Sequence, residues 1–155
     1  MPSQPVADAG ETFGLAIASD IPLPDLAPLT PGTKADVVMR EGQVETWDET
    51  DPFAITPYLR AKQRCLWFDI PGKLAMRIED GRSIVYRPHA GVPQDEVRLF
   101  LLGSGIGAIL MQRGNLVLHA NAIAMPGNGA IICLGRSGAG KSVTDPVNKA
   151  CLSGI

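Results

Sequence analysis

A glycine-rich octapeptide, GRSGAGKS at Gly135–Ser142, matches the phosphate-binding pattern G-x-x-x-x-G-K-[ST] at every position. It follows the short apolar run Ala130–Leu134, which the turn-forming sequence PGNG at Pro126–Gly129 bounds upstream. This pattern predicts a buried strand that leads directly into the glycine loop. A loop that leaves a buried strand is the context in which this motif holds the phosphates of a nucleotide.

The residues of the loop suit an anion. Glycines lack Cβ atoms, so the backbone can adopt positive φ angles and its N–H groups can converge on a phosphate. Lys141 would place its ammonium group on the β- and γ-phosphates, and the Ser142 hydroxyl would complete the coordination of Mg²⁺. The candidate cofactor-binding residues are Gly135, Arg136, Ser137, Gly138, Ala139, Gly140, Lys141 and Ser142, with Ser142 also the candidate metal ligand.

The composition narrows the choice of partners and compartment. A net charge of −2 gives no reason to expect nucleic acid or an anionic membrane as a partner. The three cysteines have no metal-binding spacing and predict free thiols in a reducing compartment. The first residues, MPSQPVADAGETFG, show no secretory signal. We therefore expect a cytoplasmic protein.

Residues 1–92 are predicted to be a β-rich region. The predicted strands are Gly14–Ala18, Ala35–Arg40, Cys65–Ile70, Leu74–Ile78 and Ser83–Arg87. The Asp80-Gly81 pair between the last two predicts a tight hairpin turn. Four prolines between Pro22 and Pro31 indicate a loop, and the polar stretch Thr46–Pro57 is expected to be a connection.

The segment Pro93–Arg113 predicts the one convincing helix. Asp95 and Glu96 complement the positive end of the helix dipole, and Gly114 suits the position after the last turn. The apolar middle, Leu99–Met111, rises only about 20 Å, which is too short to cross a membrane. We therefore expect a buried helix. Its small residues predict close packing against a sheet: Gly103, Ser104, Gly105 and Gly107.

After the helix, polar and apolar residues alternate through Asn115–Ala122, and the Pro126–Gly129 turn then leads back toward the glycine loop. We expect a hairpin that brings His119 near the loop. His119 is the candidate catalytic residue, as a proton shuttle or as a polar partner of the transferred phosphate. A hydrogen-bonded structural histidine explains the same spacing, and the sequence leaves both interpretations open.

These segments together resemble a known family. The block Val97–Ser142, VRLFLLGSGIGAILMQRGNLVLHANAIAMPGNGAIICLGRSGAGKS, is similar to HPr serine kinase/phosphorylase and its relatives. Upstream, Gly14–Leu26 (GLAIASDIPLPDL) resembles the HPr kinase-like proteins of peptide-modifying gene clusters, including lasso-peptide kinases. The resemblance implies an α/β fold. It would comprise the β-rich region 1–92 and then residues 93–155, with the buried helix and a P-loop kinase core fragment like that of HPr kinase and PEP carboxykinase.

The resemblance also implies an activity, namely phosphoryl transfer from ATP, with Mg²⁺, to a serine of a small carrier protein or precursor peptide. Such a reaction depends on positioning and charge stabilisation, and it needs carboxylates to orient the hydroxyl and bind the metal. In this family an Asp-Asp pair beyond the loop supplies them, and the sequence contains no such pair. Two alternatives compete, a non-catalytic nucleotide- or peptide-binding module and another P-loop NTPase.

The residues after the loop, VTDPVNKACLSGI at Val143–Ile155, depart from the family pattern. A phosphate loop normally continues into a helix, but Pro146 falls past the first turn, where it would cost about 3 kcal/mol. We therefore expect a truncated or frame-shifted kinase that is inactive as it stands. An incomplete sheet would leave apolar surface uncovered, so we also expect aggregation or homo-oligomers.

Overall fold

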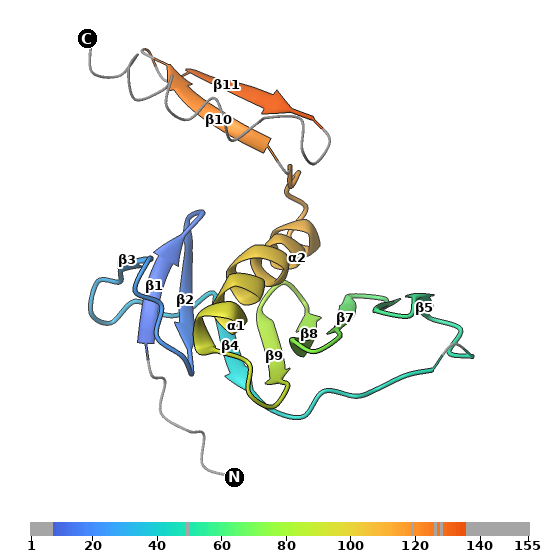
Figure 1. The fold of residues 1–155 in the computed structure, drawn as a ribbon. Coiled ribbons are helices and arrows are strands. Elements are labelled where there is room, and N and C mark those ends of the chain that lie inside the picture. Colours follow the sequence, from blue (N-terminus) through green and yellow to red (C-terminus); the bar gives the residue numbers. More distant parts are fainter. Residues whose placement is uncertain (1–7, 49, 119, 126, 128, 136–155) are drawn as a thin grey trace. The chain divides into compact units, whose positions relative to one another are not determined.

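The computed structural model describes residues 8–48, 50–118, 120–125, 127 and 129–135, and they fall into two compact units (Figure 1). The first unit covers residues 1–116, and the second begins at Val117. The first is built on a nine-stranded sheet with one helical segment, and the second contains a two-stranded hairpin.

The large sheet is mixed. Its strands are β1 (Asp8–Thr12), β2 (Leu15–Ser19), β3 (Ala27–Pro28), β4 (Val37–Glu41), β5 (Ala54–Thr56), β6 (Leu59–Lys62), β7 (Cys65–Ile70), β8 (Leu74–Glu79) and β9 (Ser83–Pro88). Their spatial order is β3-β1-β2-β4-β9-β8-β7-β6-β5. β4 pairs in parallel with β2 and with β9, whereas the other neighbours are antiparallel. The sheet thus joins the three N-terminal strands β3-β1-β2, through β4, to the five-stranded meander β9-β8-β7-β6-β5.

All five predicted strands of this region are confirmed, with shifts of one or two residues at their ends. The predicted tight turn is also confirmed, because Asp80 and Gly81 both have positive φ angles (54° and 64°), as in a type I′ turn. The predicted connection Thr46–Pro57 contains the short strand β5, and β1, β3 and β6 were not expected.

The predicted helix is confirmed over Gln94–Gln112. It consists of α1 (Gln94–Phe100), a π-helical turn η1 (Leu101–Gly105) and α2 (Ile106–Gln112) in direct succession. Gly114 has a φ of 84°, and the N–H groups of Gly114 and Asn115 donate to the carbonyls of Met111 and Leu110. This is a Schellman motif, which satisfies carbonyls that the helix end would otherwise leave free. Among the described residues, no helix is long and apolar enough to span a membrane.

The main core lies between the helical segment and one face of the sheet (Figure 1). Fully buried side chains meet there from β2, β4, β8, β9 and the helix, among them Ile17, Val37, Met39, Leu74, Met76, Ile78, Ile84, Tyr86, Leu101, Ile106 and Ile109. A Cβ atom on Gly105 would lie 3.0 Å from Cδ1 of Ile84, so the predicted close packing is confirmed there. A Cβ on Gly103 would meet nothing within 4 Å.

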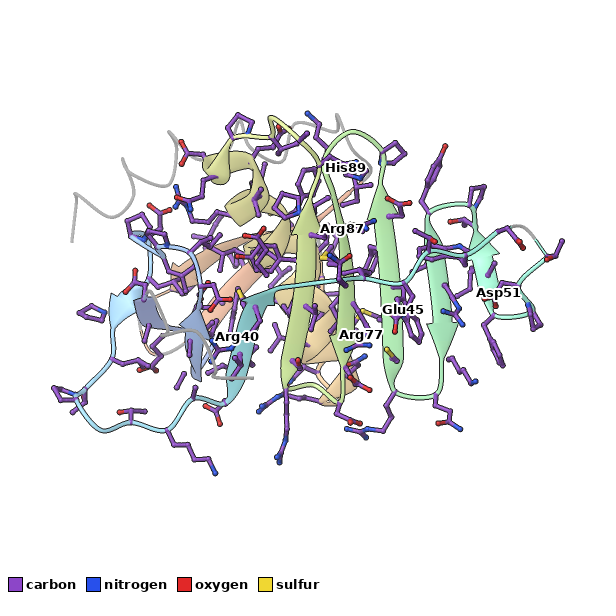
Figure 2. The ribbon with its side chains drawn as sticks, turned by 90° about the horizontal axis from the view of Figure 1, so that it is seen from below. Arg40, Glu45, Asp51, Arg77, Arg87 and His89 are labelled. Carbon is purple, nitrogen blue, oxygen red and sulfur yellow. The ribbon has the colours of Figure 1, made fainter. Side chains whose placement is uncertain are left out.

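The other face of the sheet is crossed by the strap, residues 42–48, which follows β4 (Figure 2). Gly42 donates its N–H to the Tyr86 carbonyl, and a Cβ on it would lie 3.1 Å from Val85, so a glycine lets the chain pass closely over β9. Val44 is buried in a small cluster with Trp67 and Ala75. The strap thereby covers the second face with little apolar material.

Glu45 ties the strap to the sheet (Figure 2). Its carboxylate accepts a hydrogen bond from Trp67 Nε1 at 3.0 Å and one from Arg77 at 2.9 Å. The indole N–H, and then the charge and N–H of Arg77, lower the pKa of the Glu45 carboxyl. The guanidinium of Arg60 stacks over the same Trp67 ring, 4.4 Å from its centroid. The indole thus has a carboxylate at its edge and a cation on its face.

The second unit corrects the predicted fold class. Its described strands, β10 (Ala120–Met125) and β11 (Gly129–Leu134), pair with each other antiparallel. A P-loop core has its loop strand inside a parallel sheet covered by helices, and the described chain shows a β-rich mixed sheet, one helical segment and this hairpin. The predicted α/β fold with a kinase core fragment is therefore wrong. Ile131 and Ile132, expected in a buried strand, are 49% and 51% exposed. Periodicity alone does not separate such a strand from an exposed hairpin strand.

The core contains one polar atom whose removal should help stability. The Tyr86 side chain is fully buried, and its hydroxyl has no hydrogen-bond partner among the described residues. Because an unsatisfied buried hydroxyl costs free energy, we predict that Tyr86→Phe raises the free energy of unfolding by about 1 kcal/mol, measured by urea denaturation. Tyr58→Phe, at a residue that is 55% exposed, is the control and should change little. Destabilisation by Tyr86→Phe would contradict the prediction.

The partly buried thiol of Cys65 leads us to predict a loss of folding stability at alkaline pH. Burial and then the Glu79 carboxylate raise the pKa of its thiol from 9.0 to about 11. Because the folded pKa is raised, the neutral thiol contributes stability below pH 9 that is lost as the pH rises toward 11. We predict that Cys65→Ser flattens the fall in unfolding free energy between pH 9 and 11. Cys133→Ser is the control, and identical pH profiles for wild type and Cys65→Ser would contradict the prediction.

Candidate functional site

The candidate site is the end of the β10–β11 hairpin from which the glycine loop leaves. The register pairs Met125 with Gly129 at the turn and Ala120 with Leu134 at the open end. The predicted hairpin is therefore confirmed for the described residues. Its first strand begins at Ala120, however, so the predicted strand over Asn115–Ala122 is wrong for Asn115–Leu118, which form no strand. The alternation of the paired strands is that of an antiparallel ladder, in which directly opposed side chains share a face.

The structure describes little of the predicted site itself. Gly135 directly follows β11 and is exposed. The remaining loop residues, Arg136–Ser142, lie outside the described residues, as does the candidate catalytic residue His119. Their predicted roles therefore remain predictions.

The register does constrain where these residues join the hairpin. His119 precedes Ala120 in the chain, and Gly135 follows Leu134. Ala120 and Leu134 are Cα partners in the ladder. The two chain segments that carry the predicted site therefore leave the hairpin from the same end, one from each strand.

Metal binding has no candidate in the rest of the described chain. Within the described ranges, no group of three or more His, Cys, Asp and Glu residues is placed to hold an ion. The predicted ligand Ser142 lies outside those ranges. The prediction of Mg²⁺ therefore depends on the sequence of the loop.

Sequence reasoning missed a second feature, which lies in the first unit. A pocket of about 560 Å³ has charged walls formed by Lys34, Asp36, Arg64, Asp80, Arg82 and Arg113, and we call it the cationic pocket. These residues come from four separate parts of the chain, so no local motif marks them. The only signals were Arg82 beside the predicted Asp80-Gly81 turn and Arg113 at the predicted helix end, and basic residues at such places are too common to be diagnostic.

Comparison with protein-family models, curated proteins and solved structures finds no match to this chain. The resemblance to HPr kinase-like proteins therefore depends on the residues quoted for it.

The register of the hairpin can be tested by cross-linking. Ala122 and Ile132 are Cα partners, so cysteines at both positions are expected to form a disulfide readily. We predict that Ala122→Cys/Ile132→Cys, in a chain whose native cysteines are replaced by serine, cross-links under mild oxidation, as detected by mass spectrometry of a tryptic digest.

The control pairs Ala122→Cys with Ile131→Cys, because neighbouring positions on a strand point to opposite faces. It should cross-link much more slowly. Faster cross-linking of the control pair would mean that the register is shifted by one residue.

Proposed function

We propose that this protein binds the phosphates of ATP, with Mg²⁺, through Gly135–Ser142, as an HPr-kinase-like serine kinase does. The observation that carries the proposal is the complete phosphate-loop motif, which begins at the residue directly after strand β11. Because strand β11 is hydrogen-bonded to β10 up to Leu134, it would hold the first glycine of the loop, Gly135, in place. The backbone N–H groups of the following glycines would then bind the anion.

The roles within the loop follow from the chemistry of the side chains. The Lys141 ammonium would lie on the β- and γ-phosphates, and the Ser142 hydroxyl would bind the metal. When bound, Mg²⁺ supplies neutralisation of the charge that develops on the phosphoryl oxygens. The acceptor in this proposal is a serine of a small carrier protein or a peptide.

His119 has a narrower role in the proposal. It would lie near the transferred phosphate because it directly precedes Ala120, whose Cα partner Leu134 directly precedes the loop. The sequence contains no Asp-Asp pair, which this family uses to orient the hydroxyl and bind the metal. We therefore propose ATP binding as the activity of these 155 residues, with phosphoryl transfer weak or absent.

Titration of ATP and Mg²⁺ tests the proposal directly. We predict measurable binding of a fluorescent ATP analogue, and a loss of about tenfold or more in affinity for Lys141→Ala, because a charge-assisted hydrogen bond to phosphate is lost. Lys149→Ala is the matched control, since it removes the same charge outside the motif. Absence of binding by wild type, or equal losses in both variants, would overturn the proposal.

The same preparation separates binding from catalysis. Incubation with γ-labelled ATP, Mg²⁺ and serine-containing peptides should yield little phosphoserine. Phosphoserine that forms with wild type and is absent with Lys141→Ala would show that the chain is a competent kinase without the Asp-Asp pair.

A further inference from the structure

The geometry points to a second binding site, in which the cationic pocket of the first unit holds an acidic segment of the peptide or small-protein acceptor. This inference rests on the proposed function for the existence of such an acceptor. The pocket itself lies within the first unit and belongs to none of the predicted site residues.

Four structural elements meet at this pocket. Lys34 and Asp36 lie just before β4, and Arg64 lies in the turn between β6 and β7. Asp80 and Arg82 lie in the β8–β9 turn, and Arg113 caps the C-terminal end of α2. Four cations thus face two carboxylates, in a chain whose net charge is −2. The pocket is an electropositive site on an otherwise acidic protein, and such a site attracts anions.

Two of the four cations, Arg64 and Arg113, are bound to other groups of the chain. Arg64 binds the Asp80 carboxylate at 2.7 Å. Arg113 donates to the carbonyl of Gly81 at 2.7 Å and to that of Asp36 at 3.1 Å. Gln112 adds bonds to Arg64, Ile78 and Gly81. These contacts fix the turns and the helix end against one another, and they explain Arg64 and Arg113 as structural residues.

The other two cations have no such role. Lys34 and Arg82 are exposed, and neither makes an ion pair or side-chain hydrogen bond within the described part of the chain. An unpaired guanidinium and an unpaired ammonium on the rim of one pocket can each take a carboxylate from a ligand. They are the residues that would carry the recognition.

The carboxylates in the pocket favour a peptide over a compact polyphosphate. Asp36 and Asp80 line the pocket together with the cations. A compact ligand with several negative charges at the centre of the pocket would therefore be repelled by both carboxylates. Single carboxylates spaced along an extended chain can reach Lys34 and Arg82 separately. The acidic segment is therefore the occupant whose charge spacing fits.

Fluorescence anisotropy of a labelled hexaglutamate peptide with the full chain tests this inference. We expect binding that weakens about fivefold in Lys34→Gln/Arg82→Gln, and further as salt is added, because exposed ion pairs are modest and screened. The control Lys62→Gln/Lys73→Gln makes the same change in net charge outside the pocket, and it should bind as wild type does. Circular dichroism checks that both double variants fold.

The inference would be overturned by no binding of hexaglutamate, by an equal loss in the control variant, or by equal binding of hexaglutamine. It would also be overturned if tripolyphosphate bound more tightly than hexaglutamate and lost its affinity in Lys34→Gln/Arg82→Gln, since the pocket would then belong to a small polyphosphate. Lys141→Ala separates the two proposals, because it should retain peptide binding while losing ATP. Loss of ATP binding in Lys34→Gln/Arg82→Gln would show that the two sites are one.

Discussion

The parallel pairing of β4 with both of its neighbours holds the first unit together. Without it, the three N-terminal strands β3-β1-β2 and the five-stranded meander would be separate antiparallel sheets, and the core that they share with the helical segment would be divided. Val37 and Met39 of β4 are fully buried beneath the helical segment, so the strand contributes to the core as well as to the ladder. The N-terminal strands and the meander therefore form one sheet only through this three-strand junction.

Two aspartates secure that junction at its ends. Asp36, just before β4, accepts the N–H of Ala16 at 2.9 Å, and Asp20, just after β2, accepts the N–H of Glu41 at 3.0 Å. Asp20 also pairs with Arg40 at 3.1 Å. A short parallel ladder leaves backbone groups unpaired where it ends, and these carboxylates satisfy some of them. Charge-assisted bonds to N–H groups are stronger than neutral ones, so they suit a junction of only a few residue pairs.

The two faces of the sheet are covered in different ways, and the glycines show why. Gly105 allows the helix to approach Ile84 on the main-core face, and Gly42 allows the strap to pass over Val85 on the other. The helix buries a continuous apolar surface, whereas the strap depends on Glu45 and its bonds to Trp67 and Arg77. Most of the hydrophobic stabilisation therefore comes from the helix face, and the strap adds polar ties on the other.

The strands that sequence reasoning found are those whose pattern is local. Cys65–Ile70 and Leu74–Glu79 are short, largely apolar runs separated by Pro71-Gly72, and the Asp80-Gly81 turn has its own chemistry. β1 reads Asp8–Thr12, DAGET, and has one buried residue, so it owes its strand structure to pairing with β2. The parallel pairing of β4 with β2 and β9 cannot be predicted from a local sequence pattern, because β4 and β9 are far apart in the chain. The glycine-loop motif could be recognised in the sequence. The apolar run before it, Ala130–Leu134, is compatible both with a buried parallel strand and with the antiparallel hairpin strand that the structure shows.

The two candidate sites differ in how they are assembled, and this determines what can disturb them. The proposed phosphate loop consists of eight consecutive residues, so all the groups proposed to bind phosphate lie in one stretch of sequence. The cationic pocket exists only where the start of β4, two turns and the helix end meet. An anion bound there would contact the folded state and not the unfolded chain, so its binding free energy would add to the stability of the β4 junction. Occupancy of the pocket and stability of the sheet would therefore be thermodynamically linked.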